Sequence, residues 1–125
     1  MALEIRRIYE DDPKRRLDKG GESFRIFVDR LWARGINKKE ASIDLWLKDI
    51  APSDMLRRWF GHDPRKWNEF KERYFKELDG KNESVELILQ KLHAGSSVIL
   101  LYGAKDENFN NAAALKEYLC NKLAK

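Results

Sequence analysis

The segment SVILLYG, at residues 97–103, constrains the fold of this chain most strongly. It is a continuous apolar run, rich in β-branched residues and too short to be a typical helix. Neighbouring side chains of a strand point to opposite faces, so an all-apolar strand must be covered on both. The segment therefore predicts a central strand in a sheet that carries helices on both faces.

Three other segments have the pattern of strands. LEIRRIY, at residues 3–9, alternates in polarity, and FRIFVDR, at residues 24–30, is rich in β-branched and aromatic residues. Residues 43–47 also alternate, although a helix there is an open alternative. We expect an α/β fold, a single small three-layer domain over residues 1–125 with a mostly parallel or mixed sheet of about four strands. Residues 11–23, DDPKRRLDKGGES, read as a long mobile loop between the first two strands.

The stretch WFGHDPRKWNEF, at residues 59–70, contains both the end of one helix and the start of the next. Gly61 suits the left-handed position after a helix, Asp63 can cap the next helix, and Pro64 fits its first turn. The aromatic residues that follow lie at helical spacing and are expected in the core: Trp67, Phe70 and Tyr74, with Leu78. Trp59 and His62 precede that stripe and are not explained by it.

Cap residues and apolar spacing locate the remaining helices. Asn37 can cap a short turn over residues 38–41, and Ser53, after Pro52, can open a helix that ends before Gly61. Residues 84–95 form a further helix that stops at Gly95. The last helix begins at about Ala112, with Asn110 and Asn111 as alternative caps.

Composition limits the compartment and the partners. One cysteine, Cys120, suits a reducing compartment such as the cytoplasm. The N-terminus lacks the apolar region of an export signal, and no apolar run is long enough to span a membrane, so we expect no membrane association. The 25 basic and 21 acidic residues give a net charge of +4, but they are interleaved, which is typical of a solvated surface. Nucleic-acid binding has only this small positive excess in its favour.

Polar residues follow two of the predicted strands, in VDRLWARG and YGAKDENFNN. Ligands of open α/β sheets bind outside the carboxyl ends of the strands, so these residues could meet in one crevice. Two arginines, a lysine and the start of the last helix would favour an anion such as a phosphate or carboxylate. The candidates are Asp29, Arg30, Trp32, Arg34, Tyr102, Lys105, Asp106 and Asn110. The alternative is structural: Asp29 paired with an arginine, and a capped helix.

His62 and Trp59 extend this candidate site. His62 could act as a general acid or base near neutral pH, and Trp59 could form a wall of the pocket. A histidine in a tight turn between helices is more often bonded to the backbone, which is the competing interpretation. Two histidines without ligand spacing and one cysteine predict no transition-metal site. No nucleotide-binding or nucleophile-elbow motif identifies a cofactor or a reaction, so cofactor and enzymatic activity stay open.

Four ordered motifs resemble the YeaO-like family, the domain of unknown function numbered 488. They are RIYE, VDRLWARG, WLKDIAPSDMLRRWFGHDPRKWNEFKERYFKEL and VILLYGAKDENFNNAAALKEYL, which together span nearly the whole chain. The family usually has proline where this chain has Ala33, and His-Asn where this chain has Phe109-Asn110. The missing histidine weakens any acid–base scheme built on that position. The positions that match the family's motifs are the same eight strand-end residues.

The leading hypothesis is a strand-end crevice that binds a small anionic ligand, such as a nucleotide or phosphorylated metabolite. Arg30, Arg34 and Lys105 would hold the anion, and Trp32 and Trp59 would form the walls. Asp29, Tyr102 and Asn110 would orient the ligand, and a weaker extension makes Asp29 or His62 a proton carrier. The hypothesis requires these side chains to face a common crevice. The alternative is a nucleic-acid or protein binding module that uses the dispersed basic surface.

Overall fold

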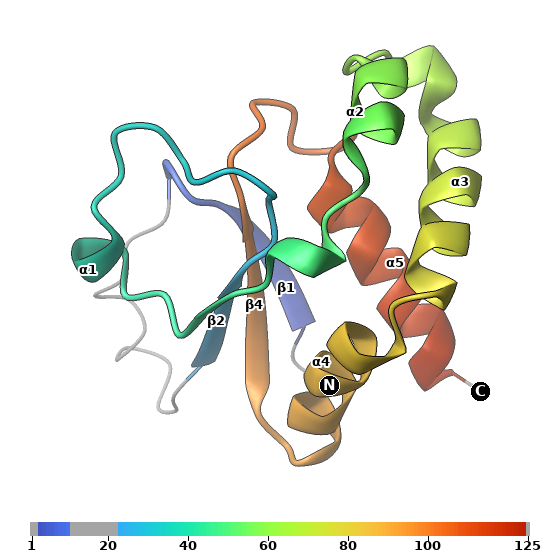
Figure 1. Ribbon diagram of the computed structural model, residues 1–125. Helices are drawn as coiled ribbons and strands as arrows, with labels where there is room; N and C mark the ends of the chain where they lie inside the picture. The colour runs from blue at the N-terminus through green and yellow to red at the C-terminus, as the bar shows by residue number, and fades with distance from the viewer. Residues whose placement is uncertain (1–2, 11–22, 125) are drawn as a thin grey trace.

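The fold, seen in a computed structural model that describes residues 3–10 and 23–124, is built on a parallel sheet (Figure 1). Its strands are β1 (Leu3–Arg7), β2 (Ser23–Phe27), β3 (Leu45–Trp46) and β4 (Ser97–Tyr102). Their order is β1-β4-β2-β3, and every neighbouring pair is parallel. The α/β class and the number of strands are as predicted, and of the two predicted arrangements, mostly parallel or mixed, the sheet is parallel throughout its described strands. The loop expected at residues 11–23 lies outside the described residues, except for Ser23.

Strand β4 is central and covered on both faces, as its sequence predicted. Val98, Leu100 and Tyr102 join a large core on one face, whereas Ile99 and Leu101 join a smaller core on the other. Leu100 pairs with a strand on each side and has no exposed surface. Removing most of such a side chain typically costs about 2–5 kcal/mol, so the position tolerates little change.

The helices cover the two faces unequally. The larger core is covered by α2 (Asp54–Phe60), α3 (Trp67–Asp79), α4 (Asn82–His93) and α5 (Asn111–Leu123). The opposite face is covered by the short α1 (Lys38–Ala41) and the irregular segment around it (Figure 1). Two 3-10 turns complete the described elements, η2 (Lys48–Ile50) and η3 (Pro64–Lys66).

The predicted helix caps are present. Asn37 caps α1, Ser53 caps α2, and Asp63 accepts a hydrogen bond from the first turn of η3. Gly61 is left-handed, with φ of 54°, and of the two candidate caps for α5 it is Asn110 that accepts a hydrogen bond from a free amide. Strand β3 is shorter than the predicted 43–47, because Ser42 before it is left-handed and η2 follows at Lys48.

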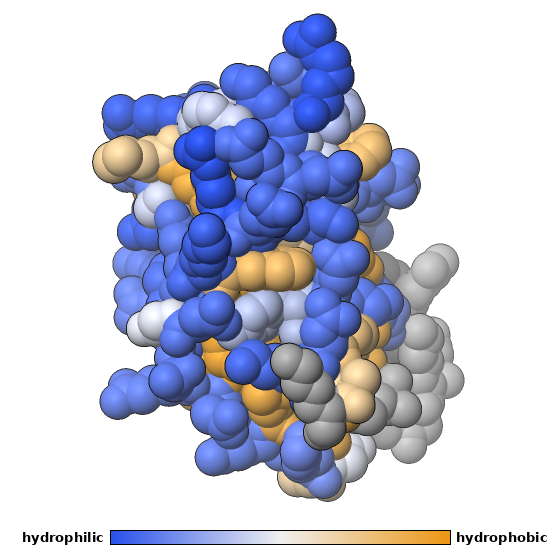
Figure 2. All heavy atoms as spheres, turned by 90° about the vertical axis from the view of Figure 1, so that its right-hand side faces the viewer, coloured by the Kyte–Doolittle hydropathy of each residue, from blue (hydrophilic) through white to orange (hydrophobic). Residues whose placement is uncertain are grey.

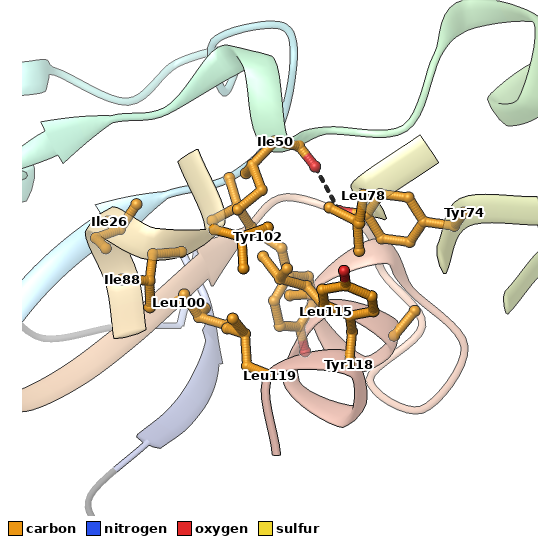
Figure 3. Packing of buried hydrophobic residues seen from close by; sticks show 14 of the residues in the cluster. Ile26, Ile50, Tyr74, Leu78, Ile88, Leu100, Tyr102, Leu115, Tyr118 and Leu119 are labelled. Carbon is orange, nitrogen blue, oxygen red and sulfur yellow. Dashed lines mark hydrogen bonds between the residues drawn. The ribbon is translucent and has the colours of Figure 1, made fainter. Parts of the chain in front are cut away.

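Amphipathic helices place their apolar side chains against the sheet. Figure 3 shows Ile88 from α4 and Leu115 and Leu119 from α5 converging on the sheet residues Ile26 and Leu100. The Tyr74 hydroxyl, fully buried in α3, donates to the Ile50 carbonyl. The face of the molecule on the α3 side is predominantly hydrophilic, with apolar side chains visible only between polar ones (Figure 2). No helix in the described part of the chain is long and apolar enough to cross a membrane.

Candidate functional site

A hollow of about 200 Å³ opens beside the carboxyl ends of β2 and β4, which are neighbours in the sheet. We call it the strand-end pocket. Its polar lining comes from Asp29, Arg30, Arg57, His62, Asn110 and Asn111. Its apolar lining comes from Leu31, Ala51, Pro52, Phe60, Phe70, Ala104 and Phe109. The segments after β2 and β4 therefore meet α2, α3 and α5 here, at the edge where parallel sheets bind their ligands.

Asp29 ties these segments together. One carboxylate oxygen accepts a hydrogen bond from the Gly103 N–H at 2.9 Å, and the other accepts one from the Asn111 side-chain amide at 3.0 Å. Burial raises the pKa of Asp29, and this effect outweighs the two hydrogen bonds and the charge of Arg57, which all lower it. With both oxygens engaged, the carboxylate links the ends of β2, β4 and α5.

Two arginines of the pocket lining approach the same oxygen of Asp54. Arg57 Nη2 lies 3.4 Å from Asp54 Oδ1, and Arg30 Nε lies 3.8 Å from the same oxygen. Arg30 also donates through Nη2 to the Pro52 carbonyl at 3.3 Å. Its Nε atom is buried and has no hydrogen-bond partner in the described part of the protein, although the side chain as a whole is 37% exposed. A buried donor of this kind calls for an acceptor.

Asn110 and its loop are held by their own hydrogen bonds. Asn110 accepts a hydrogen bond from Ala113 N at 2.8 Å and donates one to the Asp106 carbonyl at 2.9 Å. The Asp106 carboxylate accepts from the backbone of Asn108 and Phe109, and these hydrogen bonds lower its pKa. The loop is thereby ordered, and it presents Phe109 to the pocket.

His62 stands at the mouth of the pocket. It is exposed and follows Gly61 in the left-handed region, with φ of 58°. A side chain other than glycine pays a steric cost there, although histidine is enriched in this region compared with most residues. The tight turn, with two left-handed residues in succession, sets this imidazole beside the pocket.

The structure does not bring all the predicted site residues together. Asp29, Arg30, His62 and Asn110 share the pocket. Trp32 packs against Phe27 on the opposite face of the sheet, and the Trp59 ring has the cations of Lys66 and Arg73 at 5.1 and 4.3 Å from its centroid. The remaining predicted residues also lie outside the lining: Arg34, Tyr102, Lys105 and Asp106.

Those four residues have separate surroundings. Arg34 is exposed, and its carbonyl accepts a hydrogen bond from the Tyr9 hydroxyl. Tyr102 is buried in the core and borders a separate, open hollow near β1; burial raises the pKa of its hydroxyl. Lys105 is exposed, and Asp106 stabilises the loop.

Sequence reasoning did not select Arg57 and Asn111 as site residues. Arg57 lies on α2, and nothing in the sequence indicated that α2 crosses the end of β2. Asn111 was considered only as a helix cap. The signal available in the sequence was its position one residue after the cap of the last helix. The structure shows that this position contacts the end of β2. In the described residues no group of histidine, cysteine, aspartate or glutamate side chains could hold a metal ion.

Comparison with known proteins finds a family model and several relatives that match this chain. The family model described as the inactive DUF488-N3 subclade matches residues 2–125. The uncharacterized protein YeaO of Escherichia coli (strain K12) is 35% identical over 119 residues, which cover 95% of this chain and 97% of that protein. Uncharacterized proteins of Mycobacterium tuberculosis and Mycobacterium bovis are each 36% identical over 118 residues, covering 94% of this chain and 92% of theirs. No solved structure matches the chain.

Proposed function

The chain belongs to the YeaO-like DUF488 family, and from this premise we propose that its strand-end pocket binds a small anionic ligand without transforming it. One observation carries the proposal. Arg30 has a buried Nε without a hydrogen-bond partner in the described residues, and both Arg30 and Arg57 approach the same Asp54 carboxylate oxygen. A carboxylate or phosphate oxygen in the pocket would accept charge-assisted hydrogen bonds from the exposed parts of the two guanidinium groups.

The state of Asp29 favours binding over catalysis. A general base must reach a substrate proton through a free lone pair, and the hydrogen bonds from Gly103 and Asn111 occupy one lone pair on each Asp29 oxygen and fix the orientation of the carboxylate. We assign Asp29 a positioning role and place His62 beside the ligand at the pocket mouth. The description of the matching subclade as inactive agrees with this assignment.

The test is a thermal-shift and calorimetric titration with acetate, benzoate, inorganic phosphate and adenosine monophosphate. A ligand at about one hundred times its dissociation constant adds roughly 2.7 kcal/mol of stability, which raises Tm by several degrees in a domain of this size. Arg57→Gln should weaken the binding of the anion at least tenfold, since a hydrogen bond to a charged group contributes about 1.5–3 kcal/mol.

Arg58→Gln is the matched control. Arg58 follows Arg57 on α2, is exposed and does not line the pocket, so this variant should bind as the wild type does. The proposal is overturned if no anion binds to the wild type, or if both variants lose the same affinity.

A second candidate function, nucleic-acid binding, is favoured by one surface feature. The Trp46 ring, on the face opposite the pocket, has the ammonium groups of Lys38 and Lys48 at 4.7 and 4.1 Å from its centroid. Aromatic rings interleaved with cations can bind single strands, with an affinity that falls steeply as salt rises. Titration of Trp46→Ala with labelled oligonucleotides at several salt concentrations tests this alternative; salt-independent or absent binding by the wild type rejects it.

We also propose a reducing compartment such as the cytoplasm. Cys120 is free and exposed on α5, and a thiol in that state persists where disulfides do not form readily. Location of a tagged protein by cell fractionation checks this assignment.

A further inference from the structure

We infer that the ligand of the strand-end pocket is a small monocarboxylic acid with a flat, apolar body, such as an aromatic acid. The inference rests on the proposed anion-binding function and adds the chemical class of the ligand. Three properties of the pocket carry it: its size, its aromatic wall and its local charge.

The size of the pocket excludes a large guest. Its volume of about 200 Å³ lies below the roughly 300–1,000 Å³ of pockets that enclose drug-sized ligands. One ring with a short acidic group fits this space. A complete nucleotide would leave part of its structure in solvent.

The pocket wall is aromatic. The rings of Phe60 and Phe70 are stacked, with centroids 4.4 Å apart and an interplanar angle of 27°. Trp67, packed on Phe70 at 5.6 Å, also meets the Phe109 ring edge-on at 5.4 Å, so the three phenylalanines of the lining belong to one aromatic group. Phe60 and Phe70 are buried behind the surface, so a flat apolar body in the pocket would pack mainly on the half-buried Phe109 ring.

The two asparagine amides of the pocket wall have little hydrogen-bonding capacity left for the hydroxyl groups of a ligand. Asn110 uses both ends of its side-chain amide within its own loop and helix, and the Asn111 amide donates to the Val28 carbonyl and to Asp29. Hydroxyls of a sugar phosphate placed against Asn110 or Asn111 would meet side-chain amides that are already hydrogen-bonded. Since an unpaired buried polar group costs about 1–3 kcal/mol, the pocket disfavours guests rich in hydroxyls.

The local charge favours a single negative charge. Arg30 and Arg57 face the carboxylates of Asp54 and Asp29, so the two cations are already partly balanced. A carboxylate brings one charge and fits the planar guanidinium group in a bidentate arrangement. A phosphate dianion would bring a second charge next to these two carboxylates.

The decisive experiment compares benzoate with ligands that each lack one of its features. Benzyl alcohol keeps the ring and loses the charge; acetate keeps the charge and loses the ring; inorganic phosphate and adenosine monophosphate carry a phosphate instead. Calorimetry on the full chain should show benzoate binding at least about tenfold more tightly than each of these; for benzyl alcohol, tenfold is the loss expected for one charged hydrogen bond. Tighter binding of phosphate or of the nucleotide overturns this inference while leaving an anion-binding function in place. Absence of binding by every anion overturns both.

A variant of the wall provides an independent readout. Phe109→Leu should weaken benzoate binding about two- to tenfold and leave acetate binding unchanged, because only the ring contact is lost. Phe75→Leu is the control: Phe75 is also half-buried and packs on another ring, Tyr118, at 5.4 Å, but it does not line the pocket. Circular dichroism checks that both variants are folded. Equal benzoate affinity in Phe109→Leu and wild type contradicts the assigned wall. Arg57→Gln then tests the contact with the carboxylate of the same ligand. If benzoate affinity is unchanged in that variant as well, the ligand class is rejected.

Discussion

The carboxylate of Asp29 accepts a hydrogen bond from the backbone N–H of Gly103 at 2.9 Å, although 74 residues separate the two along the chain. Asp29 lies just beyond β2 and Gly103 directly follows β4. The hydrogen bond therefore joins the carboxyl ends of two neighbouring strands at the floor of the strand-end pocket. Asn111 adds the start of α5 to the same carboxylate.

The buried state of Asp29 predicts a specific dependence of stability on pH. Because burial raises its pKa above the ordinary value of 3.8, the folded protein holds this proton more tightly than the unfolded chain does. The stabilising contribution of Asp29 is then complete below pH 3.8 and is lost as pH rises through the raised pKa. Urea unfolding of wild type and Asp29→Asn across this range should show the difference in their free energies, wild type minus variant, falling with pH and then levelling. A difference that grows with pH would mean that the hydrogen bonds outweigh burial.

The close approach at Gly103 predicts that alanine is not tolerated there. A Cβ atom would lie 3.2 Å from Asp29 Oδ2 and 3.8 Å from a ring carbon of Tyr9. Since two hydrogen bonds hold the carboxylate, moving it by the few tenths of an ångström that a Cβ requires would strain them, and we expect Gly103→Ala to cost about 1–3 kcal/mol. Gly80→Ala is the control, because its Cβ would meet the Glu77 carbonyl at an ordinary 3.5 Å. Chemical denaturation should give a change of less than about 0.5 kcal/mol for the control, and a similar change in both variants would contradict the prediction.

The buried hydrogen bond of the Tyr74 hydroxyl predicts that removing this hydroxyl destabilises the core. It donates at 2.5 Å to the Ile50 carbonyl, and burial raises its pKa, so it remains a donor at all ordinary pH values. Tyr74→Phe leaves that carbonyl buried without its donor and should lower the free energy of unfolding by about 1–3 kcal/mol. Tyr118→Phe is the comparison, since its hydroxyl donates to the exposed Asp79, which water can satisfy. Denaturation midpoints measured in parallel check the order; a larger loss for Tyr118→Phe would contradict it.

Local signals made much of the fold predictable. The caps and the left-handed position are found at the predicted residues, Asn37, Asp63 and Gly61. They could be predicted because such features depend on a few adjacent residues. The continuous apolar run of β4 likewise predicts, without any long-range information, that the strand is buried on both faces. The boundaries of β3 were harder to predict, since the left-handed φ of 53° at Ser42 is unusual for serine and has no local signal.

The composition of the pocket was only partly predictable. Ligands of parallel sheets bind at the carboxyl ends of the strands, and this rule predicts that Asp29, Arg30 and Asn110 contribute to the pocket. Which way the chain turns after a strand does not follow, and the turn after Asp29 carries Trp32 back onto Phe27 on the opposite face. Arg57 depended on the packing of α2 over the pocket, a long-range contact that periodicity cannot reveal. Trp59, unexplained in the sequence, is accounted for by its contacts with two cations, Lys66 and Arg73.

The left-handed backbone at His62 predicts that stability and binding respond in opposite directions to one substitution. The φ of 58° costs a non-glycine residue about 1–2 kcal/mol, which glycine would avoid. The greater freedom of glycine in the unfolded chain offsets part of this stabilisation. His62→Gly should therefore raise the free energy of unfolding by up to about 1 kcal/mol. The same change removes the imidazole from the pocket mouth and should weaken benzoate binding about twofold or more. Ser42→Gly is the matched control, because Ser42 has nearly the same φ of 53° but lies outside the pocket lining. It should gain stability similarly and bind benzoate as the wild type does. Urea denaturation and calorimetry on the three proteins separate the two effects: unchanged affinity in His62→Gly would remove His62 from the site, and lost stability would show that its side chain supports the turn.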